Sequence, residues 1–264
     1  MNIATGYPLT SPRPFTSPWA WAVPIISLCA GLLTWLLGLN ETLFLAINQL
    51  GRSELGSVFW ANTTILGDTL VAFALSGLLA KRRLDIVWVA LLAALFTTAW
   101  VHVLKPLFDN PRPLAVISEG LIHVIGEPLR KGSFPSGHTA TVFTLAGAIC
   151  LQGVRPVFAI GALLIALLAG VSRAIVGAHW PLDICAGAFG GWLAAYIGHR
   201  LAQRWPTPTS KKGRMLVAIL LLACSLSLLF LHDTGYPAFA LQIIIAALST
   251  ASLVYYFITL YRTT

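Results

Sequence analysis

Long apolar segments separated by short polar ones dominate this chain of 264 residues. Most of these segments approach the roughly 20 residues that an α-helix needs to cross the hydrocarbon core of a bilayer. A membrane β-barrel would instead show short segments of alternating polarity, so the pattern predicts transmembrane helices. The eight predicted spans are residues 19–39, 62–80, 85–104, 139–151, 156–171, 182–201, 215–231 and 238–258.

The remaining segments divide the chain into four predicted parts. Residues 1–18 are rich in proline, serine and threonine and are expected to form a disordered arm, and the long apolar run after them predicts a retained helix rather than a signal peptide. Residues 19–202 form the predicted membrane core, in which the mixed segment 41–61 lies at the membrane interface. Residues 203–214 are a basic cytoplasmic linker, and residues 215–264 an additional transmembrane hairpin.

Composition narrows the class of protein further. The chain is 57% hydrophobic with a mean hydropathy of +0.81, which excludes an ordinary soluble domain. Its net charge of +8 does not predict a nucleic-acid partner, because the basic residues lie at the ends of apolar segments rather than on one soluble face. All four cysteines lie within or beside predicted spans without metal-ligand spacing, so they are expected to be packing residues.

The distribution of positive charge predicts the orientation. With a cytoplasmic N-terminus, eleven of the 17 lysine and arginine residues lie on the cytoplasmic side, as the positive-inside bias requires. The other side holds Arg52, Lys105, Arg112, Arg130, Lys131 and Arg173. Positive charge on the disfavoured side indicates an anionic ligand there.

Three polar clusters fall at span ends on that same side. Lys105 and Arg112 form the first cluster, Ser136, Gly137 and His138 the second, and Arg173, His179 and Asp183 the third. Three fixed cations suit a multiply charged oxyanion, of which phosphate is the expected one. The serine and glycine precede a predicted helix, so backbone N–H groups would converge on the same oxygens.

The two histidines and the carboxylate predict catalysis rather than binding alone. His179 is the candidate nucleophile, because Asp183 lies one helical turn away and can hold its other ring nitrogen. His138 would protonate the leaving group and then deprotonate a water molecule. Helix capping would also explain Asp183, and interfacial placement would explain Lys105 and Arg173.

The three clusters, Lys105 to Pro113, Pro135 to His138 and Ser172 to Asp183, resemble the signature motifs of the type 2 phosphatidic acid phosphatase superfamily in residue type, spacing and order. That superfamily includes integral membrane lipid phosphatases, glucose-6-phosphatase and soluble vanadium haloperoxidases. The resemblance covers about residues 60 to 202. It implies an all-α, polytopic membrane bundle with a six-helix phosphatase core, to which residues 215–264 add an extra C-terminal helix pair.

The resemblance also implies the roles of the site residues. His179 is the nucleophile, Asp183 its orienting partner and His138 the general acid. The phosphate-binding positions are Lys105, Arg112, Ser136, Gly137 and Arg173. No metal and no cofactor is expected, since the nine acidic residues are scattered without the paired carboxylates that seat Mg²⁺.

Residues and resemblance together predict a metal-independent phosphatase of the bacterial inner membrane, with its site on the periplasmic or extracytoplasmic side. Its substrate would be a lipid phosphate or diphosphate, such as undecaprenyl diphosphate, phosphatidylglycerophosphate or phosphatidic acid. A lipid A phosphatase, a phosphotransferase, and a non-catalytic lipid phosphate binder or transporter are the alternatives. The sequence predicts no oligomeric state.

Overall fold

The computed structural model describes residues 18–262, and these contain helices and no strand. The predicted arm therefore lies outside the described residues except for Pro18, which begins η2 (Pro18–Trp21). The α-helices are α1 (Ala22–Leu36), α2 (Asn40–Asn48), α3 (Glu54–Thr64), α4 (Thr69–Leu79), α5 (Leu84–Phe108), α6 (Pro113–Val116), α7 (Gly137–Cys150), α8 (Pro156–Ile175), α9 (Pro181–Arg204), α10 (Lys211–Phe230) and α11 (Phe239–Arg262). Two further 3₁₀ turns are η3 (Gln49–Gly51) and η4 (Ile65–Gly67). The predicted all-α class is confirmed.

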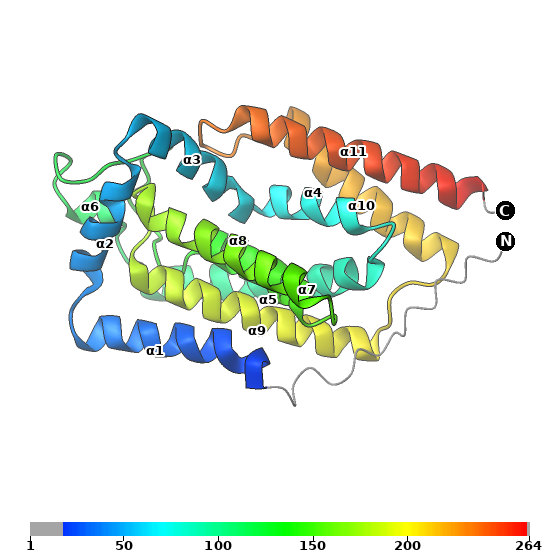
Figure 1. The fold of residues 1–264 in the computed structure, drawn as a ribbon, viewed down its shortest axis with the longest axis horizontal. Helices are drawn as coiled ribbons and strands as arrows, with labels where there is room; N and C mark the ends of the chain where they lie inside the picture. Colours follow the sequence, from blue (N-terminus) through cyan, green and yellow to red (C-terminus); the bar gives the residue numbers. More distant parts are fainter. Residues whose placement is uncertain (1–17, 263–264) are drawn as a thin grey trace.

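The long helices run side by side along one axis, with α9 in the interior (Figure 1). Helix α9 packs against α7, α5 and α1, and α10 and α11 pack against each other and against α4. The short helices α2 and α6 gather at one end of the bundle, while the last described residues lie toward the other end (Figure 1). Large apolar side chains are exposed on α1, α8, α10 and α11, as lipid-facing helices require.

Four helical segments are long and apolar enough to cross a membrane: Leu84–Val116, Pro156–Ile175, Lys211–Phe230 and Phe239–Arg262. Two bent pairs raise the number of candidates to six, of which Ala22–Leu36 with Asn40–Gly51 turns by 110°. The chain is thus a multi-pass membrane protein, although only four to six of its described segments qualify as candidate spans, against the eight expected from hydropathy.

The predicted span over residues 62–80 is not a single straight helix. The chain bends by 72° between Glu54–Gly67 and Thr69–Leu79. Asp68 causes a new helix to begin there, because its Oδ1 accepts hydrogen bonds from the backbone N–H groups of Leu70 and Val71 at 2.8 and 3.1 Å. The aspartate thus satisfies N–H groups that the preceding helix cannot.

Two further predicted spans differ from simple membrane helices. Helix α7 has 14 residues, and at 1.5 Å per residue it reaches only about 21 Å of a hydrocarbon core roughly 30 Å thick. Helix α9 has 24 residues but is not among the apolar candidates. It lies inside the bundle, where small residues that allow close helix packing replace large lipid-facing ones.

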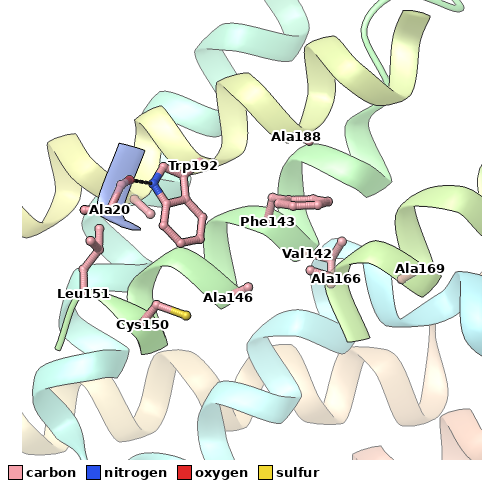
Figure 2. Close-up of a cluster of buried hydrophobic side chains, with 11 residues drawn as sticks. Ala20, Val142, Phe143, Ala146, Cys150, Leu151, Ala166, Ala169, Ala188 and Trp192 are labelled. Carbon is pink, nitrogen blue, oxygen red and sulfur yellow. Dashed lines mark hydrogen bonds between the residues drawn. The ribbon is translucent and has the colours of Figure 1, made fainter. Parts of the chain in front are cut away.

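Glycines let the other helices approach α9 at backbone distance. A Cβ atom on Gly187 would lie 2.6 Å from the carbonyl oxygen of Ser136, and one on Gly191 would overlap the carbonyl oxygen of Ala140. Beside this contact a cluster of buried side chains joins α7, α8 and α9 (Figure 2). There the indole of Trp192 donates a 2.8 Å hydrogen bond to the carbonyl oxygen of Ala20. Close packing thereby holds the start of α7 against α9.

The C-terminal hairpin of α10 and α11 is packed onto the rest of the bundle. Val87 of α5 shares a buried cluster with Leu221 and Leu253 of the hairpin. Ser225 and Ser249 join the two hairpin helices through a 2.8 Å hydrogen bond between their hydroxyl groups. The connection between α10 and α11, residues 231–238, lies at the end of the bundle that holds the three sequence clusters.

Candidate active site

All eight predicted site residues lie at one end of the bundle, where α5 and α8 end and α7 and α9 begin. Lys105 is in the last turn of α5, and Arg112 directly precedes α6. Ser136 and Gly137 begin α7, and His138 follows them. Arg173 is in the last turn of α8, His179 lies in the connection after it, and Asp183 is in the first turn of α9.

His179 and Asp183 form a buried pair. The imidazole Nδ1 lies 3.2 Å from Asp183 Oδ2, and each side chain is only 2% exposed. Because a carboxylate only accepts hydrogen bonds, Nδ1 carries the proton and Nε2 carries the lone pair. The pair therefore has the geometry of an imidazole whose free nitrogen is available as a nucleophile.

The carboxylate of Asp183 is itself held by two more donors. Its Oδ2 accepts hydrogen bonds from the Ser133 hydroxyl and, at 2.9 Å, from the backbone N–H of Trp180. The second bond satisfies an N–H group at the start of α9, so helix capping and the pairing with His179 both hold. The orientation of the carboxylate is consequently independent of the substrate.

A tight turn places His179 over the end of α8. The backbone N–H groups of Ala178 and His179 both donate to the carbonyl oxygen of Arg173 at 3.0 Å. Gly177 has a φ of +80°, and a Cβ atom there would lie 2.7 Å from the carbonyl oxygen of His123. This position therefore requires glycine for both its conformation and its space.

Arg112 is anchored to three backbone carbonyl groups. Its Nε donates to Lys131 at 2.8 Å, Nη1 to Ala178 at 3.0 Å and Nη2 to Gly132 at 3.3 Å. A guanidinium has five N–H groups, so two make no hydrogen bond within residues 18–262. The side chain is 6% exposed, and a buried cation with free donors indicates an anion site.

Arg173 is buried even more completely, with 2% exposure. Its Nη1 donates to Thr64 Oγ1 at 2.7 Å, whereas its Nε is buried without a hydrogen-bond partner among residues 18–262. The interfacial interpretation of Arg173 is thus wrong, because the guanidinium points into the protein rather than toward the membrane surface. The partnerless Nε provides a further donor for an anion.

His138 lies in the first turn of α7, directly after Ser136 and Gly137. The Nε2 atom of His138 is buried and has no hydrogen-bond partner within the described part of the chain. Ser136 caps α7, with its hydroxyl accepting hydrogen bonds from the Thr139 backbone and hydroxyl at 3.3 and 2.9 Å. Its own N–H donates to the Asp183 carbonyl oxygen at 3.0 Å, which ties the start of α7 to α9.

The charges around His179 come from all three clusters. Burial is the largest effect that holds the pKa of His179 well below its ordinary value, followed by the positive charges of Arg112, Arg173 and Lys105 and the charge that His138 can carry. The imidazole is therefore neutral at pH 7, which is the form that can attack an electrophile.

An elongated cavity of about 230 Å³ leads away from the site between α4, α5 and α7. It has Lys105 and His138 at one end and Ala90 and Leu145 at the other. The lining residues of α5 extend over 15 positions, or about 22 Å at 1.5 Å per residue. Because most of its lining is apolar, the cavity suits a hydrocarbon chain attached to a group held at Lys105.

Sequence reasoning missed four residues that complete the site: Thr64, Ser133, His232 and Tyr236. Thr64 and Ser133 bond to Arg173 and Asp183, and Tyr236 stacks on Arg173. His232 pairs with Asp68, one of the cavity residues. Only Ser133 offered a sequence signal, since it lies three residues before Ser136.

Comparisons with known proteins agree with this architecture. The family model described as PAP2 superfamily matches residues 86–206. The putative undecaprenyl-diphosphatase YbjG of Escherichia coli is 32% identical over 185 residues, covering 63% of this chain and 88% of that protein. A lipid A 1-phosphatase of Rhizobium etli is 43% identical over 63 residues, which are 24% of this chain and only 26% of that protein.

A solved structure shares the fold. The crystal structure of Aquifex aeolicus LpxE is 34% identical and superposes with a TM-score of 0.57, covering 61% of this chain and 95% of that one. Helices α10 and α11 lie beyond the residues that the family model matches. The extent of these matches, together with the all-helical fold, shows that the chain belongs to the PAP2 superfamily of membrane lipid phosphatases.

Proposed function

We propose that this protein removes the terminal phosphate from a lipid phosphate or diphosphate through a phosphohistidine formed on His179. The observation that carries the proposal is the buried His179–Asp183 pair beside two buried arginines that retain free donors. A protein that only binds lipid phosphate needs the cations but not an oriented imidazole. Hydrolysis therefore accounts for more of the site than binding does.

The first step forms the covalent intermediate. Nε2 of His179 attacks phosphorus, and the bond between phosphorus and the leaving oxygen breaks. His138 donates its proton to that oxygen, while Asp183 compensates the positive charge that develops on the His179 ring. Arg112, Arg173 and Lys105 stabilise the three equatorial oxygens, a role that metal ions take in other phosphoryl transfers.

The second step releases phosphate. His138, now neutral, takes a proton from a water molecule that attacks phosphorus, and the bond between phosphorus and nitrogen breaks. Inorganic phosphate leaves, and both histidines return to their starting protonation states. The backbone N–H of Gly137 adds a donor at the start of α7 throughout, whereas the N–H of Ser136 is already bonded to the Asp183 carbonyl oxygen. Neither a metal nor a cofactor is required in this scheme.

The substrate class follows from the apolar cavity next to Lys105. We assign undecaprenyl diphosphate first, then phosphatidylglycerophosphate and phosphatidic acid, because a similar protein is named a putative undecaprenyl-diphosphatase. A lipid A phosphatase is the second candidate, favoured by the 34% identity to Aquifex aeolicus LpxE.

The excess of cytoplasmic positive charge supports a site on the non-cytoplasmic face of a bacterial inner membrane. In this proposal residues 19–202 form the catalytic core, residues 203–214 the linker, and residues 215–264 an added hairpin.

The proposal is tested with the purified full chain in detergent. Phosphate release is measured from undecaprenyl diphosphate, phosphatidylglycerophosphate, phosphatidic acid and lipid A for the wild type, His179→Ala and a control, His199→Ala. His199 is buried in α9, about four turns beyond Asp183, and hydrogen-bonded to Gln203 at 3.1 Å, so its loss perturbs the fold without removing a group from the site. We expect His179→Ala to lose at least about a thousandfold in kcat/KM on every active substrate. Undiminished release would contradict the mechanism.

Label transfer separates hydrolysis from its alternatives. With a lipid labelled in its terminal phosphate, a phosphatase places the label in free phosphate, and a phosphotransferase places it in a second lipid. A lipid phosphate binder or transporter leaves it where it was. With a diphosphate lipid, whose phosphate leaving group depends less on the acid than an alkoxide does, His138→Ala is expected to accumulate acid-labile label on the protein, because release of the phosphohistidine still needs the base.

A further inference from the structure

The loop between α10 and α11, residues 231–238, reaches into the candidate active site. One of its side chains contacts a residue that lines the cavity, and another contacts two site residues. His232 Nε2 lies 3.0 Å from Asp68 Oδ2, beside the apolar cavity. The ring of Tyr236 lies under the Arg173 guanidinium, with 5.2 Å between the ring centroid and Cζ, and 6.3 Å from the ring of His138. This loop belongs to the hairpin that the family model does not match.

Neighbouring segments hold Tyr236 in place. The backbone N–H of Glu127 donates to the carbonyl oxygen of Gly235 at 3.0 Å. A Cβ atom on Gly126 would overlap the Tyr236 ring, so the two loops meet at close contact there. Gln242 of α11 donates to the carbonyl oxygen of His232 at 2.7 Å. Tyr236 is 7% exposed, and its ring therefore presents a fixed surface to Arg173.

Arg173 has little else to fix the plane of its guanidinium. Thr64 supplies a hydrogen bond to Nη1, and Nε has no partner within residues 18–262. A guanidinium that grips phosphate must present its N–H groups in a defined plane. An aromatic face against a desolvated guanidinium attracts the charge and restricts rotation.

We propose that Tyr236 is a positioning residue, which holds the Arg173 guanidinium and the neighbouring His138 in the geometry that binds phosphate. The hairpin thereby supplies part of the active site, a role distinct from anchoring the chain in the membrane. This inference rests on the proposed function only in taking phosphate as the ligand of Arg173. If Tyr236 has this role, the affinity of the site for phosphate depends on an aromatic ring at position 236.

The test compares Tyr236→Leu and Tyr236→Phe with Tyr256→Leu in the purified full chain. Tyr256 is a matched control, because it is a buried tyrosine of the same hairpin, 6% exposed, within the cluster that contains Val87 and not at the site. Tyr236→Met serves in place of Tyr236→Leu if the leucine variant does not fold. Two quantities are measured: the inhibition constant of inorganic phosphate against lipid turnover, and the rise in Tm that inorganic phosphate produces.

We expect Tyr236→Leu to weaken inhibition by phosphate about tenfold and to lower kcat/KM by a similar factor. Tyr256→Leu should lower the Tm without moving the inhibition constant, since only packing is lost. Tyr236→Phe keeps the ring and should restore the inhibition constant to within about twofold of wild type. Equal inhibition constants for Tyr236→Leu and Tyr256→Leu overturn the inference, as does an equal loss in Tyr236→Phe and Tyr236→Leu.

The two proposals fail in different ways. A wild-type protein that releases no phosphate from any lipid contradicts the proposed function. The inference is then decided by the Tm measurement alone: a smaller phosphate-induced rise for Tyr236→Leu than for Tyr256→Leu supports it, and equal rises overturn it. An active wild type with equal rises overturns the inference and leaves the phosphatase standing.

Discussion

Replacing Arg112 by lysine separates the charge of this residue from its geometry. Lysine keeps one positive charge but has three N–H donors instead of five, and no planar fork. The guanidinium of Arg112 uses three donors on the carbonyl oxygens of Lys131, Gly132 and Ala178, and in the proposed mechanism the other two bind phosphate. A lysine cannot satisfy both sets.

The magnitude follows from the two donors that make no hydrogen bond within residues 18–262. Hydrogen bonds to charged groups contribute about 1.5 to 3 kcal/mol each, so losing both costs about 3 to 6 kcal/mol of transition-state stabilisation. That range corresponds to a fall in kcat/KM of roughly a hundredfold to ten-thousandfold. If charge alone mattered, Arg112→Lys would stay within about tenfold of wild type.

The assay is steady-state phosphate release from the preferred lipid, with a Tm measurement to show that the variant is folded. The control is Arg130→Lys. Arg130 lies in the same segment and bonds to the Leu114 carbonyl oxygen and to Glu119, but its side chain is 54% exposed. Its ion pair contributes at most about 1 kcal/mol, so we expect less than a fivefold effect. An Arg112→Lys variant as active as Arg130→Lys would refute the assignment of two phosphate-binding donors to this guanidinium.

Two further predictions concern pH and packing. Because the pKa of His179 is lowered, the imidazole stays neutral until the pH falls through that lowered value. The acid limb of the kcat/KM profile should therefore lie below pH 6.5. An acid limb at or above pH 6.5, at the same pH for monophosphate and diphosphate lipids, would contradict this prediction. Gly191→Ala should lower the Tm, because its Cβ overlaps the Ala140 carbonyl oxygen and overpacking costs about 1 to 3 kcal/mol. Gly161→Ala, which meets open space, is the control, and equal Tm values for the two variants would disprove the packing argument.

Residues close together in the chain could be placed from the sequence. His179 and Asp183 are four residues apart, and this spacing predicted the contact that the structure shows at 3.2 Å, although His179 precedes α9 instead of lying on its first turn. The apolar segments similarly predicted an all-helical membrane protein, since the backbone in lipid must satisfy its own hydrogen bonds. Spacing along the chain and the membrane environment are enough to predict such features without knowledge of the tertiary contacts.

Hydropathy was a poor guide to the structure at segments whose polar or small residues make tertiary contacts. Residues 62–80 are apolar enough to predict one span, but Asp68 caps a new helix there and also pairs with His232, 164 positions later. Helix α9 is less apolar than a lipid-facing helix because its glycines accept the backbones of α5 and α7. A hydropathy average over a window does not detect the single capping aspartate at position 68, and it does not distinguish a helix buried in the bundle, such as α9, from a lipid-facing one.

The sequence by itself determined the membrane class, the three ordered clusters and the chemistry that they predict. Only the tertiary structure decided which side chains complete the site: Thr64 on Arg173 across 109 positions, Ser133 on Asp183 across 50, and Tyr236 stacked on the same arginine. These residues follow no periodic pattern and carry no charge of their own. Their roles exist because helix packing brings distant segments to one buried point, where every polar group needs a partner.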